Sequence, residues 1–177
     1  MTDRTVEPAF GVTMPVWAQR RVNAAGVALV KDFEGLHLAP YLCPAKVWTI
    51  GYGHTRTVRA GMRISPEQAD QLLADDLSLA ARAVARLVRV PLNDNQFAAL
   101  VSFVFNVGTT NFENSTLLKL LNRGWYEQVP AQLTRWNRAS GEVLGGLARR
   151  RAAEARLWGT EPRPALPDIF AATVGEA

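Results

Sequence analysis

Two helix-start signals of the same kind divide the middle of this chain. The first is Ser65-Pro66-Glu67-Gln68, and the second pairs Asn93 with Gln96 at the same spacing. In such a capping box the first side chain accepts a hydrogen bond from the backbone N–H three residues on, and the glutamine side chain accepts one from the first residue's N–H. Proline at the first helical position strengthens the first signal. We therefore predict a long helix that ends before Pro91 and a second helix that ends at Gly108.

Apolar residues follow both signals at helical spacing. They are Leu72, Leu73, Leu77, Ala80, Val84, Leu87 and Val88 after the first signal, and Leu100, Phe103, Val104 and Val107 after the second. A comparable run precedes Gly35, and further helices are expected over about 115–123, 125–136 and 147–158, the last after the Gly145-Gly146 break. Most of the chain is therefore expected to be helical.

The segment between Pro40 and Met62 follows a different pattern. It is rich in Tyr, Val, Trp, Thr and Ile and is interrupted by Gly51, Gly53 and Gly61. Short strands and tight turns are expected there, over about 40–64. With the helices, this predicts an α+β fold that is mainly α, with a small β-rich lobe and a larger helical lobe.

The length of 177 residues suits a single domain with one sizeable core. The ends of the chain contain several prolines and no helical pattern, so irregular segments are expected at 1–16 and 160–177. The globular domain is therefore expected at 17–159.

The charge and the cysteine count restrict the possible partners. A formal charge of +4 suits an anionic partner such as a cell-wall polymer, a nucleic acid or a membrane, and does not choose among them. Cys43 is the single cysteine and only two histidines accompany it, so no disulfide framework, metal site or cofactor is predicted. Because neither a signal peptide nor a membrane-spanning segment is recognisable, synthesis in the cytoplasm is expected.

Glu34 is the candidate proton donor. It stands before Gly35 at the expected end of a helix, between the apolar residues Phe33 and Leu36. The negative end of the helix dipole and the apolar neighbours both favour a protonated carboxyl. Glycosidic cleavage needs such a group to protonate the leaving oxygen. Most glutamates at helix ends are solvated surface residues, so the position alone does not assign this function.

The residues after Glu34 form a specific pattern. Glu34-Gly35-Leu36 is followed by Tyr41-Leu42-Cys43-Pro44 and by Trp48-Thr49-Ile50-Gly51-Tyr52-Gly53-His54-Thr55. This pattern resembles the active-site region of glycoside hydrolase family 24, the phage-type lysozymes, in which a glutamate is followed nine residues on by aspartate or cysteine and six residues later by threonine. Residues 96–108 resemble the family's central buried helix, and Gly145-Gly146-Leu147 through Leu157-Trp158 resemble its C-terminal signature.

The resemblance covers about 22–158 and implies a two-lobed lysozyme-like fold with the substrate cleft between the lobes. It implies an endolysin, a muramidase that hydrolyses the β-1,4 bond between N-acetylmuramic acid and N-acetylglucosamine in bacterial peptidoglycan, with inversion, and so lyses the cell. The expected partner is peptidoglycan and not nucleic acid. A monomer is expected, made in the host cytoplasm and released to the periplasm through a holin pore.

The resemblance also implies residue roles. Glu34 is the expected catalytic acid, and Thr49 and Cys43 are expected to hold the attacking water. Phe105 and Ser115 match positions that contact sugars in the cleft. His54 is expected to brace the β-rich lobe. One arginine of the pair Arg150 and Arg151 is expected to approach Glu34.

The role of Cys43 and two other functions of the chain remain open on the sequence. Cys43 stands where many members carry a carboxylate, and a thiol is mostly neutral at pH 7, so it either positions water, acts as an activated thiolate nucleophile or is a structural residue. The missing second carboxylate also suits a lytic transglycosylase, which forms 1,6-anhydro products without water. The third alternative is a non-catalytic wall-binding module.

Trp48, Trp125, Trp136 and Trp158 fall within apolar patterns. They are therefore predicted to pack in the core or between the lobes.

Overall fold

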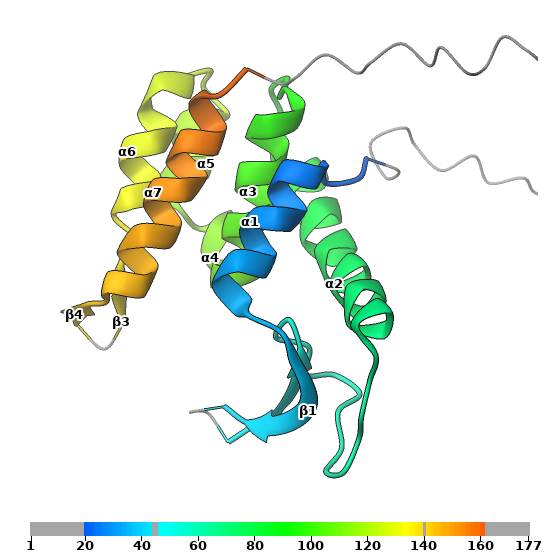
Figure 1. The fold of residues 1–177 in the computed structure, drawn as a ribbon. Helices are drawn as coiled ribbons and strands as arrows, with labels where there is room; N and C mark the ends of the chain where they lie inside the picture. Colours follow the sequence, from blue (N-terminus) through cyan, green and yellow to red (C-terminus); the bar gives the residue numbers. More distant parts are fainter. Residues whose placement is uncertain (1–19, 44–45, 140, 162–177) are drawn as a thin grey trace, which may run out of the picture.

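The computed structural model describes residues 20–43, 46–139 and 141–161 (Figure 1). The helices are α1 (Ala24–Glu34), α2 (Pro66–Leu87), α3 (Asp94–Val107), α4 (Thr109–Glu113), α5 (Thr116–Leu121), α6 (Val129–Thr134) and α7 (Gly145–Gly159), with a 3-10 turn at Tyr126–Gln128. The strands β1 (His37–Leu42) and β2 (Trp48–Gly51) form one antiparallel hairpin, and β3 (Arg138–Ala139) and β4 (Glu142–Val143) form another. The predictions for 1–16 and for 162–177 lie outside the described residues.

Both predicted capping boxes are present. Ser65 Oγ accepts a hydrogen bond from the Gln68 N–H at 3.3 Å, and Gln68 Oε1 accepts one from the Ser65 N–H at 2.8 Å. Asn93 and Gln96 make the same reciprocal pair at 2.8 and 3.0 Å. The two helices end at Leu87 and Val107, as the sequence predicted.

The core is built around α3. All residues from Phe97 to Val104 are buried, and α3 packs against α1, α2 and α7. The crossing of α1 and α3 depends on Gly26, where a Cβ atom would lie 2.7 Å from Ala98 Cβ. This close packing fixes the direction of α1 and therefore the position of Glu34 at its end.

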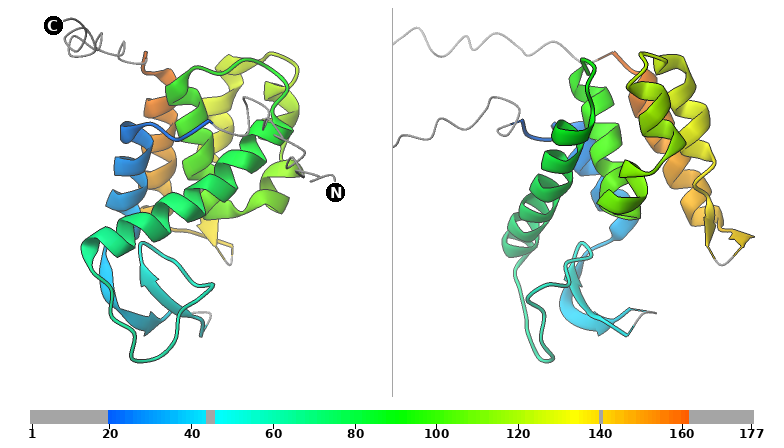
Figure 2. Two further views of the ribbon diagram at one scale, coloured as in Figure 1. Left: turned by 90° about the vertical axis from the view of Figure 1, so that its right-hand side faces the viewer. Right: turned by 180° about the vertical axis from the view of Figure 1, so that it is seen from behind.

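The β-rich lobe forms one end of the molecule, connected to the helices by the end of α1 and the start of α2 (Figure 2). Its register pairs Tyr41 with Thr49 and Leu42 with Trp48, and a bulge separates Tyr41 from His37. Cross-strand partners point to the same side of a hairpin, and successive residues alternate. Tyr41 and Thr49 therefore share one face, and Leu42 and Trp48 share the other.

The α+β, mainly α, two-lobed architecture is confirmed, with some local corrections. The first strand begins at His37 and not at 40. Residues 109–113, which the sequence did not mark as a helix, form α4, whose buried Phe112 packs edge-on against Phe103 with ring centroids 6.2 Å apart. Five residues are too few for a helical period to show in the sequence.

The second local correction concerns Gly145 and Gly146, where the sequence predicted a break before the last helix. The two glycines instead form the first turn of α7. Glycine is costly mainly in the middle of a helix, and these are the first two positions. The hairpin β3–β4, with two residues in each strand, was not predicted. Among the helices of the described ranges, none has the length and apolar character needed to cross a membrane.

Candidate active site

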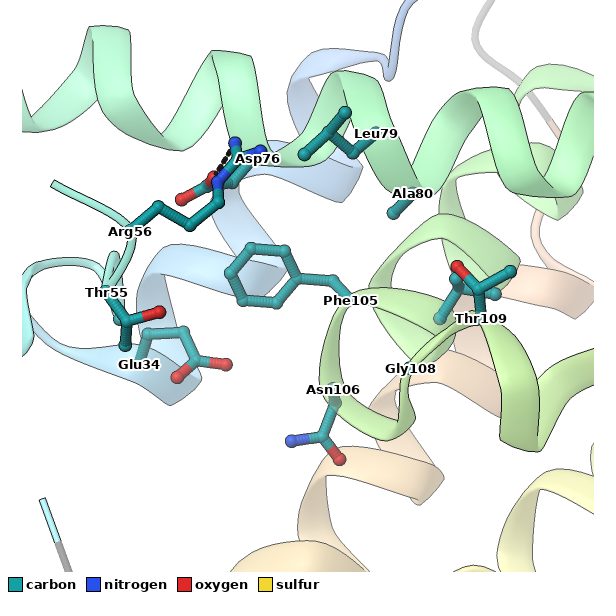
Figure 3. Close-up of a pocket in the computed structure, with 12 residues that line it drawn as sticks. Glu34, Thr55, Arg56, Asp76, Leu79, Ala80, Phe105, Asn106, Gly108 and Thr109 are labelled. Atoms are coloured by element: carbon teal, nitrogen blue, oxygen red, sulfur yellow. Dashed lines mark hydrogen bonds and ion pairs between the residues drawn. The ribbon is translucent and has the colours of Figure 1, made fainter. Parts of the chain in front are cut away.

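A cavity of about 400 Å³ lies where the β-rich lobe meets the helices (Figure 3). Its walls come from the end of α1, the loop after β2, the middle of α2 and the junction of α3 with α4. The lining residues are Glu34, Gly53, Thr55, Arg56, Asp76, Leu79, Ala80, Val104, Phe105, Asn106, Gly108 and Thr109. Glu34 and Phe105, which the family resemblance placed in the cleft, therefore line the same cavity.

Glu34 is the last residue of α1, and its side chain is 22% exposed. Gly35 ends the helix with a φ of 69°, a conformation that favours glycine, and its N–H donates to the Lys31 carbonyl. Gly53 approaches from the loop after β2, where a Cβ atom would lie 3.4 Å from Glu34 Oε2. In Figure 3 the Glu34 carboxyl group and the Phe105 ring both project into the cavity.

Arg150 on α7 holds the Glu34 carboxyl. Its Nη1 donates to Glu34 Oε1, its Nε donates to Glu154 Oε1 at 3.3 Å and its Nη2 donates to the Ser102 carbonyl at 3.4 Å. The Arg150 side chain is only 4% exposed. Arg150 thus engages Oε1, and Oε2 makes no ion pair within the described residues.

Behind Arg150 lies a buried polar network between α3 and α7. Ser102 Oγ donates to Glu154 Oε1 at 2.8 Å, and Arg151 Nη1 lies 3.2 Å from Glu154 Oε2. Arg151 Nη2 donates to Asn106 Oδ1 at 2.6 Å, which connects the network to the cavity wall. Burial raises the pKa of Glu154 and lowers the pKa of Arg151 to about 10.

His54 connects the β-rich lobe to α2. Its Nδ1 lies 2.7 Å from Asp76 Oδ2, and its Nε2 lies 3.0 Å from Thr57 Oγ1. Asp76 also accepts a hydrogen bond from Arg56 Nη2 at 2.8 Å. Both ring nitrogens of the buried His54 are thus engaged, which supports the bracing role expected of this residue.

Thr49 and Cys43 come together at the hairpin. The buried Thr49 donates its hydroxyl proton to the Val47 carbonyl at 3.1 Å, and the Cys43 N–H donates to the same carbonyl at 3.0 Å. Tyr41 lies on the same hairpin face as Thr49. Burial raises the pKa of Tyr41, and the charges of the Glu34 carboxyl and the Cys43 thiol raise it further. Neither Thr49 nor Cys43 is among the residues that line the cavity.

The family model described as Phage lysozyme matches residues 31–154. The chain belongs to the phage lysozyme family. The endolysin of Acyrthosiphon pisum secondary endosymbiont phage 1 is 41% identical over 141 residues, which cover 77% of this chain and 97% of that protein. The SAR-endolysin of Escherichia phage Mu is 42% identical over 125 residues, 71% of this chain and 73% of that protein. The muramidase domain of SpmX from Asticaccaulis excentricus superposes with a TM-score of 0.76 at 41% identity, covering 81% of this chain and all of that domain.

Ser115, which the family resemblance placed among the sugar contacts, has a different environment. It is buried at the N-cap of α5, where its hydroxyl donates to the Phe112 carbonyl at 2.6 Å and accepts from the Leu118 N–H at 3.0 Å. Ser115 does not line the cavity. This geometry gives no support to a sugar contact at Ser115.

Several polar residues of the cavity wall were not singled out from the sequence. Thr55 and Asn106 lie inside the matching segments, so those segments could have indicated them. Asp76 had no such signal, because its partner His54 is 22 residues away on another element.

The packing prediction for the tryptophans is wrong at two positions. Trp158 is buried and Trp136 packs against Phe103, but Trp48 is 37% exposed and Trp125 is 47% exposed. Trp48 lies next to the turn of the two-stranded hairpin, beside its exposed cross-strand partner Leu42.

Proposed function

We propose that this phage lysozyme family member is an endolysin that hydrolyses the β-1,4 bond between N-acetylmuramic acid and N-acetylglucosamine in peptidoglycan. The observation that carries the proposal is the Glu34 carboxyl, directed into a cavity between two lobes with one oxygen held by Arg150. The family match and the named endolysin and muramidase relatives support the same activity.

In this mechanism Glu34 is the general acid. As the bond between the anomeric carbon and the glycosidic oxygen breaks, Oε2 transfers its proton to the leaving oxygen. A water adds to the anomeric carbon from the opposite side and releases its own proton to the solvent, which leaves a hydroxyl on the new reducing end. Arg150 fixes the carboxyl so that its proton is directed at the substrate. The half-buried Phe105 ring, which projects into the cavity, is proposed to contact the sugar beside the cleaved bond.

Thr49 is proposed to orient the water. Since its own hydroxyl proton is directed to the Val47 carbonyl, Thr49 Oγ1 is left to accept a hydrogen bond from the water. A water that donates to Thr49 has its lone pairs free for the anomeric carbon. Cys43, held by the same carbonyl, is proposed to contact this water from the end of β1.

We further propose that the enzyme meets its substrate in the periplasm. This location requires a route across the inner membrane of the host after cytoplasmic synthesis, and a holin pore is the route we propose. We also propose that the enzyme acts as a monomer.

A turbidity assay tests the proposed activity. The purified full chain is expected to clear a suspension of permeabilised Gram-negative cells and to release soluble fragments from purified sacculi. A non-catalytic module would pellet with the sacculi and leave the turbidity unchanged. That outcome would contradict the proposal.

We predict that Thr49→Val lowers the rate of sacculus hydrolysis by about tenfold, the value of one lost hydrogen bond of about 1.4 kcal/mol. Stability should change little, because the two side chains have nearly the same shape and Val47 keeps its bond from Cys43. Thr134→Val is the matched control, since Thr134 makes the same kind of bond, to the Ala131 carbonyl, on the exposed surface of α6. Turnover and melting temperature are measured in parallel. An unchanged rate for Thr49→Val would leave Thr49 a structural role only.

Cys43 variants distinguish water positioning from nucleophilic catalysis. If Cys43 contacts the water, Cys43→Ser and Cys43→Asp should both hydrolyse sacculi, because a hydroxyl or a carboxylate can hold the same water, and Cys43→Ala should be slower than either. Rates and product anomers are measured for each variant. A folded but inactive Cys43→Ser, together with retained anomers from the unmodified enzyme, would instead indicate a thiolate nucleophile.

A further inference from the structure

The β-rich lobe contains the entire excess positive charge of the chain. Residues 35–66 include Lys46, Arg56, Arg59 and Arg63 and no aspartate or glutamate, so these four basic residues equal the formal charge of +4 of all 177 residues. All four side chains are exposed. Arg56 pairs with Asp76 of α2, whereas no ion pair within the described residues involves the other three.

One face of the β1–β2 hairpin, called here its outer face, has exposed apolar side chains at Leu38, Leu42 and Trp48, whereas Ile50, which alternates onto the same face, is fully buried. Leu42 is 53% exposed beside Trp48, its cross-strand partner. His37 pairs with Gly51, which lies on the same face of β2 as Thr49. Leu38 follows His37 and therefore lies on the opposite face, with Leu42 and Trp48, where it is exposed. The hairpin lies at one end of the molecule, below the helices in Figure 1.

Exposed leucines next to tryptophan and unpaired basic residues match the chemistry of one partner class. Leucine side chains gain free energy when they leave water for an apolar environment, which a lipid bilayer provides more fully than a polysaccharide. Tryptophan concentrates at the interface between lipid and water, and basic side chains are attracted to acidic headgroups. Buried apolar area and attraction to anionic lipids add to each other, so the two signals together bind a membrane more strongly than either alone.

We propose that the outer face of this hairpin binds the surface of an anionic lipid bilayer. Leu42 and Trp48 enter the headgroup region, and Lys46, Arg59 and Arg63 meet the acidic headgroups. No residue of β1 or β2 lines the cavity, so docking in this way leaves the cavity accessible. The binding does not depend on catalysis.

Co-sedimentation of the full chain with lipid vesicles tests the proposal. Vesicles of phosphatidylglycerol and phosphatidylethanolamine should bind the chain, pure phosphatidylcholine vesicles should bind it much less, and added salt should weaken the binding. The double variant Leu42→Ser/Trp48→Ser and the triple variant Lys46→Glu/Arg59→Glu/Arg63→Glu should each lower the partition coefficient by about tenfold or more.

Trp125→Ser/Leu144→Ser is the matched control, because it removes an exposed tryptophan and an exposed leucine from the helical lobe. This control should bind acidic vesicles as the unmodified chain does. Circular dichroism checks the fold of each variant. If Leu42→Ser/Trp48→Ser does not fold, the loss of vesicle binding in Lys46→Glu/Arg59→Glu/Arg63→Glu tests the proposal.

The proposal is overturned if the unmodified chain stays in the supernatant with acidic vesicles, or if the control loses as much binding as the hairpin variants. It is also overturned if light scattering shows a dimer that Leu42→Ser/Trp48→Ser dissociates while vesicle binding is absent. That result would assign the hairpin face to a second copy of the chain.

Discussion

Replacement of Glu34 by glutamine is expected to lower the rate of peptidoglycan hydrolysis by a factor of about a hundred to ten thousand, the usual contribution of general acid catalysis. The amide has the shape of the carboxyl, and its oxygen can still accept the hydrogen bond from Arg150 Nη1. It has no proton of suitable acidity to transfer to the leaving oxygen. The fold should therefore persist while the chemistry is lost.

Initial rates of dye release from labelled sacculi, compared at equal concentrations of folded protein, measure this effect. Glu113→Gln is the control, because Glu113 is an exposed carboxyl at the end of the short helix α4. The control should retain the full rate. A folded Glu34→Gln variant with more than about a tenth of the original rate would remove Glu34 from the acid role.

Replacement of Arg150 by methionine is expected to reduce both stability and activity. Arg150 is almost fully buried and connects Glu34 to Glu154, so its loss leaves a buried carboxylate with less compensation, at a cost of about 3 kcal/mol in the free energy of unfolding. Hydrolysis should slow by about tenfold to a hundredfold, because the Glu34 carboxyl is no longer held in one orientation.

The stability loss in Arg150→Met should depend on pH. Burial raises the pKa of Glu154, and Arg150 opposes this rise. When the pKa of a carboxyl is higher in the folded chain than in the unfolded chain, the folded state binds more protons between these two pKa values. The free energy of unfolding therefore falls as the pH rises from the unfolded-state pKa toward the folded-state pKa. Without Arg150 this pKa is higher still. The stability difference between the variant and the original chain should therefore be small in acid and should grow as the pH rises through the pKa of Glu154.

Urea unfolding at several pH values, with activity measured at each, tests this account. Arg149→Met is the matched control, since Arg149 precedes Arg150 on α7 and is exposed. Arg150→Lys should recover only part of the loss, because one ammonium group does not reproduce the three contacts of the guanidinium. Equal stability losses in Arg149→Met and Arg150→Met would contradict the role given to Arg150.

The sequence was informative where local signals determine structure. The capping boxes placed the starts of α2 and α3, and Gly35 placed the end of α1, which put Glu34 at a helix terminus. These features depend on hydrogen bonds and backbone conformations within a few residues, so they can be recognised without the rest of the fold.

The sequence was less informative where the outcome depends on packing between distant elements. Arg150 and Arg151 are adjacent, and only the orientation of α7 against α3 determines that Arg150 meets Glu34 while Arg151 meets Asn106. The partnership of His54 with Asp76 likewise requires the β-rich lobe to lie against α2. Trp48 is exposed next to the hairpin turn while Ile50, two residues further along β2, is fully buried, so the exposure depends on how far the neighbouring segments cover the strand.

The most direct test of the central claim is mass spectrometry of the muropeptides released from sacculi in water enriched in oxygen-18. If Glu34 protonates the leaving oxygen and water attacks, the products should be N-acetylmuramic acid reducing ends that carry one oxygen-18 atom. A predominance of 1,6-anhydro ends without the heavy oxygen would contradict hydrolysis and would instead show that the sugar's own hydroxyl attacks.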